Sequence, residues 1–197
     1  MLKIHSMALG LYKTNCYIVH QEGSSACIII DPGYEPETIL DFLDQNHLTP
    51  EAILLTHGHF DHVGAVRTLA AEFALCQVYL CKEDLIMPPQ MTAGPLYYNA
   101  FLKDGAVLHL AGITWEVLHT PGHTPGSVCL IAENNLFSGD TLFCGSCGRT
   151  DLPCGSSGDL TRSLHRLSLL SQDYLVFPGH GDSTTLAQEK QYNPYLK

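Results

Sequence analysis

Short apolar runs that end in polar turns recur along the chain. The runs at 15–20 and 26–30 are rich in Ile and Val, and the Gln-Glu-Gly-Ser-Ser stretch between them predicts a β-hairpin. The same pattern predicts further strands at 52–55, 77–81, 106–110, 113–119, 127–132, 136–138 and 174–177. Strands are therefore the main predicted element, and in the second half Gly or Asn turns join them into hairpins.

Helical spacing of apolar residues is limited to a few segments. It predicts helices at 37–46, at 61–73, and from Asp159, as the capping residue, to about 170. The stretch 84–104 mixes Pro, Met, Gly and aromatic residues without a clean period, and we expect a loop with one helical turn there. Two strand-rich halves, each with helices, predict an α/β fold in which four layers form an αββα sandwich.

Length and composition indicate a globular chain. Its 197 residues suit one domain over 1–197, and 45% apolar against 15% charged residues excludes a disordered protein. The formal charge of -10 excludes the basic surface that nucleic acids and anionic membranes attract, so we expect neither as a partner. With no signal-peptide pattern and no apolar run near the roughly 18 residues of a membrane span, we expect a cytoplasmic protein.

Eight cysteines are many for such a chain, and we expect reduced thiols because no export signal precedes them. Five of them lie among Ile, Val and Leu and are expected to pack as small apolar residues: Cys16, Cys27, Cys76, Cys81 and Cys129. Cys144, Cys147 and Cys154 share one loop. A Cys-x-x-Cys pair is typical of redox or zinc sites, but the sequence has no second such pair, so we assign these three no chemical role.

The candidate chemistry is concentrated where a buried strand runs into a helix, in Leu-Leu-Thr-His-Gly-His-Phe-Asp-His-Val-Gly at 54–64. Side chains of an extended segment alternate, so His57 and His59 are expected to face the same cation. The turn after them redirects Asp61 and His62 toward a neighbouring position. This arrangement favours two adjacent metal ions. The other histidines, His119 among them, have no comparable context and are interpreted as structural or surface residues.

His57, His59, Asp61 and His62 match the His-x-His-x-Asp-His signature, and the sequence therefore resembles the metallo-β-lactamase superfamily. The resemblance implies three further ligands, and the chain has them in order after predicted strands: His123, Asp140 and His180. It also implies how the seven are shared. His57, His59 and His123 would hold one metal ion, Asp61, His62 and His180 the other, and Asp140 would bridge them.

Asp31 stands just before Pro32-Gly33 and matches another superfamily position. Two interpretations remain open at this stage. Asp31 would orient a ligand histidine by hydrogen bonding to it, or it would only form a turn before the proline.

Imidazole and carboxylate ligands, in contrast to a closed cage of cysteines, leave an exchangeable position for a catalytic metal. We expect two divalent ions, zinc in the first place, with iron or manganese as alternatives. Two cations lower the pKa of a shared water from about 15.7 toward 7, which implies a hydrolase acting through attack of a metal-bound hydroxide. Asp61 would orient that hydroxide and is the expected catalytic residue.

The segment at 139–153 and the closing Gln-Tyr-Asn-Pro-Tyr-Leu resemble glyoxalase II, the hydroxyacylglutathione hydrolases, and especially their short bacterial members. This resemblance implies an acyl thioester as the small-molecule substrate. The chain ends about where the helical domain of the long enzymes would begin, and Asp151 replaces an expected aromatic contact with glutathione. Arg149 matches a basic residue of the family loop; it would bind a substrate carboxylate or only pair with Asp151 or Asp159.

The sequence leaves three alternatives: a mononuclear iron persulfide dioxygenase, a lactonase, and a metal-binding interaction module without catalysis. The presence of all seven candidate ligands argues against the last of these. The expected assembly is a monomer or a homodimer.

Overall fold

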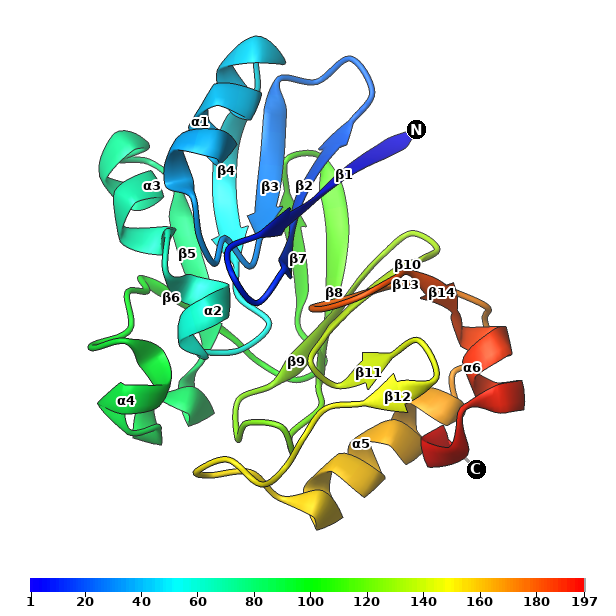
Figure 1. Cartoon of the computed structure of the whole chain (residues 1–197). Coiled ribbons are helices and arrows are strands. Elements are labelled where there is room, and N and C mark those ends of the chain that lie inside the picture. The colour runs from blue at the N-terminus through cyan, green and yellow to red at the C-terminus, as the bar shows by residue number, and fades with distance from the viewer. Residues whose placement is uncertain (197) are drawn as a thin grey trace.

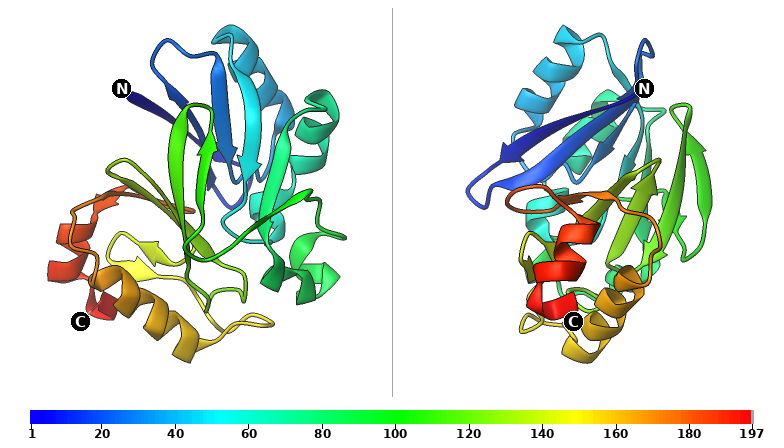
Figure 2. Two further views of the ribbon diagram at one scale, coloured as in Figure 1. Left: turned by 180° about the vertical axis from the view of Figure 1, so that it is seen from behind. Right: turned by 90° about the vertical axis from the view of Figure 1, so that its right-hand side faces the viewer.

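The computed structural model describes residues 1–196. Two six-stranded sheets face each other, and helices cover the outer face of each sheet (Figures 1 and 2). This is the predicted four-layer αββα sandwich, which is confirmed.

The first sheet is built from the N-terminal half. Its strands, in spatial order, are β1 (Leu2–Leu9), β2 (Thr14–Gln21), β3 (Ala26–Ile30), β4 (Thr49–Leu54), β5 (Gln77–Cys81) and β6 (Ala100–Leu102). Strands β1 to β3 are antiparallel, and β3 to β6 are parallel. Parallel neighbours need long crossovers, which here contain α1 (Pro36–Gln45), α2 (Phe60–Val63) and α3 (Val66–Glu72). Between β5 and β6 lie the 3₁₀ helix η1 (Lys82–Ile86) and α4 (Pro89–Thr92).

The second sheet is mainly antiparallel. Its spatial order is β14 (Thr184–Thr185), β13 (Leu175–Pro178), β10 (Asn135–Gly139), β9 (Val128–Ala132), β8 (Ile113–His119) and β7 (Val107–Leu110). Among the pairs of this second sheet that residues 1–196 form, only β10–β13 is parallel, and α5 (Ser157–Ser168) lies in its crossover. A small hairpin follows β10, formed by β11 (Leu142–Phe143) and β12 (Ser146–Cys147). The chain continues after β14 through α6 (Leu186–Tyr192) and η2 (Pro194–Leu196).

Apolar side chains fill all three spaces between the four layers. Ile28 and Ile30 of β3 point into the space between the sheets, where they meet Trp115, while Ile29 points to the opposite face and packs under α1. Because both faces of this sheet are buried, its strands have continuous apolar runs instead of alternation. On the other side of the sandwich, α5 packs on the second sheet through leucines spaced four and three apart: Leu160, Leu164 and Leu167.

Predicted strands at 26–30, 77–81 and 113–119 agree with the structure to the residue, whereas other elements differ. The predicted helix at 61–73 is two helices, α2 and α3, separated at Gly64 and Ala65. The capping residue of α5 is Ser156, not Asp159, because the Ser156 hydroxyl accepts a hydrogen bond from the Asp159 N–H. The segment 84–104 also contains more structure than one helical turn, namely most of η1, α4 and β6.

Strands β1, β6 and β14 were not predicted, and all three lie at sheet edges. β1 includes polar residues, and β6 and β14 have only three and two residues, so none of them forms a clear apolar run. Within residues 1–196, no helix is long and apolar enough to cross a membrane.

We expect Phe137→Ala to lower the free energy of unfolding by about 3–5 kcal/mol, the range for emptying a large aromatic site. Phe137 is fully buried between the sheets, with its ring 5.3 Å from those of both Tyr17 and Phe177. Urea unfolding followed by tryptophan fluorescence measures the change. Leu169→Ala, at a site 70% exposed, is the control and should stay within about 0.5 kcal/mol of the wild type. Equal effects of both substitutions would contradict the assignment of this core.

Candidate metal centre

All seven candidate ligands lie beyond the ends of strands, on the same edge of the sandwich. Their positions are as follows: His57 and His59 in the segment from β4 to α2, Asp61 and His62 within α2, His123 between β8 and β9, Asp140 directly after β10, and His180 after β13. Both sheets therefore contribute. Six of the seven are buried and His180 is half-buried.

Three histidines converge on one point. The Nδ1 atom of His59 lies 3.1 Å from Nε2 of His57 and 2.9 Å from Nε2 of His123. A tetrahedral zinc ion with Zn–N bonds near 2.0–2.1 Å holds its ligand nitrogens about 3.4 Å apart. The three nitrogens are thus spaced closely enough to share one ion.

A second group lies beside the first, and Asp140 reaches both. The Nε2 atom of His180 is 3.2 Å from Oδ2 of Asp61, and Nε2 of His62 is 3.7 Å from the same oxygen. Asp140 places Oδ1 3.4 Å from Nε2 of His62 and Oδ2 3.4 Å from Nε2 of His123. This carboxylate therefore lies beside ligand atoms of both groups.

Hydrogen bonds on the far side of three rings orient them toward the centre. The Nδ1 atom of His62 lies 2.9 Å from a carboxylate oxygen of Asp31. The Nδ1 atom of His123 lies 2.8 Å from the carbonyl oxygen of Arg149, and that of His180 lies 3.1 Å from the carbonyl oxygen of Tyr12. Such oxygens can only accept, so each neutral ring carries its proton on Nδ1 and directs the lone pair of Nε2 inward.

The donor set fits divalent cations. Nε2 of His62 and Oδ1 of Asp140 are buried and, among the residues 1–196, have no hydrogen-bond partner, although they face each other. Two lone pairs this close repel each other unless a proton or a cation lies between them. Neutral imidazole together with carboxylate suits zinc, iron and manganese.

Burial and neighbouring carboxylates shift the pKa values of the ligand histidines in opposite directions. Burial lowers the pKa of His59 to about 4 and that of His57 well below its ordinary value, with neighbouring histidines adding to the effect. Burial also opposes the charged form of His62, but the carboxylates of Asp140 and Asp31 outweigh it and hold the His62 pKa well above its ordinary value. His57 and His59 are therefore neutral at pH 7, whereas a cation would have to displace a proton from His62.

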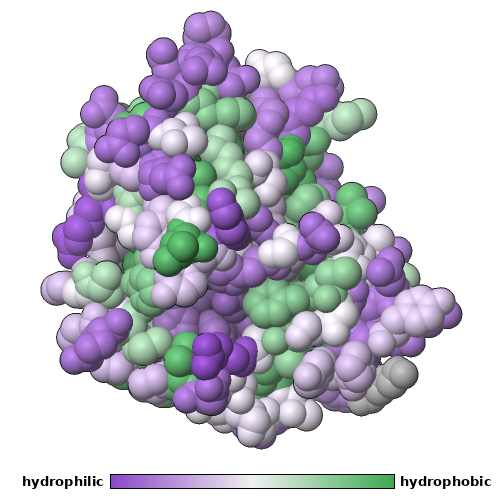
Figure 3. All heavy atoms as spheres, in the orientation of Figure 1, coloured by the Kyte–Doolittle hydropathy of each residue, from purple (hydrophilic) through white to green (hydrophobic). Residues whose placement is uncertain are grey.

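A cavity of about 610 Å³ opens beside these ligands. Its wall combines five of them with apolar and polar neighbours: Tyr12, His59, Phe60, Asp61, Met91, His123, Asp140, Phe143, Ser146, Cys147, Arg149, Leu152 and His180. On the face shown in Figure 3, apolar residues in green are scattered among polar residues in purple. A solvent-open cavity beside the seven side chains allows a small substrate to reach them.

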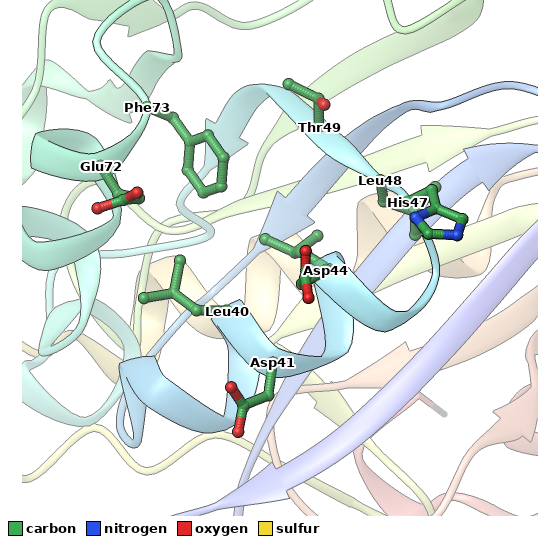
Figure 4. Close-up of a pocket in the computed structure, with 9 residues that line it drawn as sticks. Leu40, Asp41, Asp44, His47, Leu48, Thr49, Glu72 and Phe73 are labelled. Atoms are coloured by element: carbon green, nitrogen blue, oxygen red, sulfur yellow. The ribbon is translucent and has the colours of Figure 1, made fainter.

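A second cavity, about 690 Å³ in volume, lies between α1 and α3 (Figure 4). Three carboxylates line it, from Asp41 and Asp44 of α1 and Glu72 of α3. No residue of this cavity belongs to a cluster of three potential metal ligands within residues 1–196. The candidate active site is therefore the cavity at the strand ends.

Comparisons with known proteins agree with this geometry. A sequence model of the metallo-beta-lactamase superfamily matches residues 9–180, the span that contains all seven candidate ligands. The chain belongs to this superfamily.

Several similar proteins align with this chain over nearly their whole length. Hydroxyacylglutathione hydrolase GloC of Haemophilus influenzae is 35% identical over 99% of this chain and 98% of that protein. The crystal structure of BLEG-1, a B3 metallo-beta-lactamase, matches with a TM-score of 0.87 and 38% identity and covers 100% of both chains. TTHA1623, solved in a di-iron-bound form, matches with a TM-score of 0.85 and 41% identity over 98% of this chain and 100% of that one. These likenesses place the chain in a superfamily of metallo-hydrolases.

Asp31 lies under the candidate metal centre and is 2% exposed. Its Oδ1 accepts the N–H of Thr56 at 2.8 Å, and its Oδ2 faces His62. Asp31 also adopts a left-handed backbone conformation with a φ of 51°. The contact with His62 supports the first of the two interpretations, in which Asp31 orients a ligand.

Arg149 lines the cavity, but its guanidinium is already paired. It donates two hydrogen bonds of 2.7 Å to the carboxylate of Asp151, and both side chains are exposed. Asp159, the other predicted partner, pairs with Arg162 instead. An exposed pair contributes little to stability, so Asp151 can release Arg149 to a substrate carboxylate at low cost.

Asp84, which no sequence pattern indicated, is a fully buried carboxylate that joins two ligand loops. Its Oδ2 accepts the N–H of Gly58 at 2.7 Å, and its Oδ1 accepts the N–H of Gly126 at 2.6 Å. Thr124 donates a third hydrogen bond, from its hydroxyl. Gly58 separates His57 from His59, and Thr124 follows His123. Nothing in the aperiodic segment 84–104 could have indicated this role.

We expect Asp84→Asn to loosen the first group of ligands. An amide has one acceptor oxygen, so in either orientation its NH₂ faces the N–H of Gly58 or Gly126, and a buried N–H left unpaired costs about 1–3 kcal/mol. The variant should unfold at lower urea and lose its metal to a chelator at least about tenfold faster, by analogy with supporting contacts of other metal sites.

Metal analysis after timed chelator exposure measures this loss. Asp41→Asn, which alters an exposed carboxylate of α1, is the matched control and should behave as the wild type. Wild-type retention of metal by Asp84→Asn would disprove the positioning role.

Proposed function

We propose that the protein is a dinuclear metal-dependent hydrolase that cleaves an acyl thioester, such as a hydroxyacylglutathione, to a hydroxy acid and a thiol. The observation that carries this proposal is the position of Asp140 between two groups of three ligands, at the base of an open cavity. Whole-length similarity to GloC supports this class of substrate. The sequence expectation of zinc remains part of the proposal, and the di-iron form of TTHA1623 keeps iron as the alternative.

Two divalent ions held by these residues would supply an acidified water at neutral pH and positive charge for the developing oxyanion. The role of the protein is to orient the reactants. Asp61 stays ionised: burial raises its pKa, but the hydrogen bond with His180 and the charges of His62 and His180 lower it further than burial raises it. The Thr14 hydroxyl donates to Asp61 at 3.1 Å and fixes the carboxylate. Asp61 can therefore accept a hydrogen bond from a water molecule and orient it.

A thioester suits the groups that line the cavity. A thiol with a pKa of about 8.5 leaves as a thiolate without the help of a general acid. The aromatic and apolar side chains of Phe60, Met91 and Phe143 offer contact area to an acyl or thiol portion, and Arg149 offers charge to a carboxylate. No cationic side chain besides Arg149 and the histidines lines the cavity within residues 1–196.

Ring opening of a lactone or β-lactam is the second candidate function, because BLEG-1 is a metallo-beta-lactamase with 38% identity over the full length of both chains. The same oriented water and oxyanion charge would serve either reaction. The completeness of the second ligand group, Asp61, His62 and His180, favours two ions over the single iron of a persulfide dioxygenase.

Metal-loaded protein should hydrolyse S-lactoylglutathione, and Asp61→Asn should reduce kcat by at least about 10²-fold, because a neutral amide is a weaker metal ligand than a carboxylate and lacks the charge that orients the water. Thiol release measures the rate, and metal analysis of both proteins separates loss of metal from loss of orientation. A lactone, a β-lactam and a persulfide are assayed in parallel. If one of these is turned over and the thioester is not, the substrate class is wrong.

Arg149→Ala should raise KM for a substrate that carries a carboxylate by about tenfold, the effect of losing one charged hydrogen bond, with kcat nearly unchanged. The substitution leaves the carbonyl group that orients His123 in place. Arg162→Ala removes another arginine from an exposed pair and is the control. An unchanged KM would exclude Arg149 from substrate binding.

A further inference from the structure

A second cluster of metal-ligating side chains lies outside the candidate metal centre. It consists of Cys81 at the end of β5, Glu83 in η1 and His119 at the end of β8. One ligand atom of each residue lies within 4.8 Å of the others, and Sγ of Cys81 is 2.9 Å from Oε2 of Glu83. Residues from both sheets thus bring a thiol, a carboxylate and an imidazole to one place.

We propose that Cys81, Glu83 and His119 form an additional site for a thiophilic divalent cation such as zinc. Sulfur, oxygen and nitrogen donors in a group of three match tetrahedral zinc with one position left for water. Cys81 is buried, whereas Glu83 and His119 are half-buried, so the site has a buried side that holds sulfur and a solvent side that admits the ion.

The charges of the ligands balance the ion. Burial and the neighbouring Glu83 carboxylate raise the pKa of the Cys81 thiol to about 12, so without an ion it is a neutral thiol beside a carboxylate. Binding replaces the S–H bond by a metal–sulfur bond and releases the proton to solvent. The thiolate and the carboxylate then neutralise the two charges of the cation in this partly buried place.

The surroundings hold His119 in position. Its Nε2 lies 2.8 Å from the carbonyl oxygen of Pro125, which places the ring proton on Nε2 and leaves the lone pair on Nδ1. Its backbone N–H donates to Asp104 at 2.8 Å, and its carbonyl oxygen accepts from Arg166 at 3.0 Å. A ligand fixed in this way loses little conformational entropy when an ion binds.

The location connects this site with the candidate metal centre. Glu83 precedes Asp84, the carboxylate that joins the two ligand loops, and His119 ends β8 directly before the loop that contains His123. An ion bound to both residues would cross-link η1 to the end of β8. It would therefore stabilise the base of the metal centre from outside, without touching the substrate cavity.

Cobalt distinguishes this site from the other one, because only a thiolate ligand gives an intense sulfur-to-cobalt charge-transfer band. Metal-free full-length protein is titrated with Co²⁺ in buffer that contains a reductant without metal affinity. The wild type should develop the band for one of the bound Co²⁺ equivalents and release one thiol proton with it. The affinity for Co²⁺ should fall about tenfold for each unit by which the pH is lowered, because the thiol must lose its proton to bind the ion.

Variants assign the band to its residues. Cys81→Ser should abolish it, whereas Cys147→Ser, which alters the cysteine that lines the substrate cavity, should retain it. Glu83→Gln and His119→Gln, at half-buried positions, should each weaken Co²⁺ binding by at least about tenfold. Circular dichroism checks that each variant is folded, and the two half-buried substitutions decide the matter if Cys81→Ser does not fold.

The proposal is overturned by the absence of a band in the wild type. It is also overturned by a band that survives Cys81→Ser or disappears in Cys147→Ser, or by unchanged affinity in both Glu83→Gln and His119→Gln. These readouts involve no thioester turnover, so they are independent of the hydrolase activity proposed above.

Discussion

The candidate metal centre depends on one carboxylate that both halves of the molecule must position. Asp140 directly follows β10 of the second sheet, yet its Oδ1 atom faces His62 of α2, which follows β4 of the first sheet. The contact exists only if the two sheets pack in one relative position. The apolar layer between them, with Trp115 and Phe137 fully buried, enforces that position because close-packed interiors tolerate little sliding.

Hydrogen bonds from side chains of β2 position His180, the ligand nearest the C-terminus. Pro178 lies two residues before His180 and Gly181 directly after it, and their carbonyl oxygens accept from the side chain of Asn15 at 3.0 and 2.9 Å. The Tyr17 hydroxyl donates to the Pro178 carbonyl at 2.6 Å. At Gly179 an added Cβ would overlap Oδ1 of Asp140, so only glycine leaves room for that carboxylate. The His180 loop is thus shaped by a strand that lies more than 150 residues earlier.

Buried carboxylates are costly unless every oxygen has a partner, and the site meets this requirement in two ways. Asp31 and Asp84 are satisfied by the protein itself, through backbone N–H groups, hydroxyls and one imidazole. Asp140, in contrast, keeps a buried oxygen with no hydrogen-bond partner among residues 1–196. The carboxylates that support the loops have their oxygens satisfied by hydrogen bonds, whereas the carboxylate between the two ligand groups has an oxygen available to bind a cation.

Local sequence by itself determined the strands with continuous apolar runs, the αββα class and the set of candidate ligands. A run such as 26–30, short, rich in Ile and bounded by turn residues, is typical of a buried strand, and His57, His59, Asp61 and His62 lie within six residues of one another. Edge strands such as β1 were not predictable, since their polar residues are stabilised by pairing with a neighbour instead of by burial. Only the tertiary structure decided the partners of Asp31 and Arg149, the role of Asp84, and the meeting of Cys81, Glu83 and His119. These depend on contacts between segments that are distant in sequence, and residue type and spacing do not encode which loops a folded chain brings together.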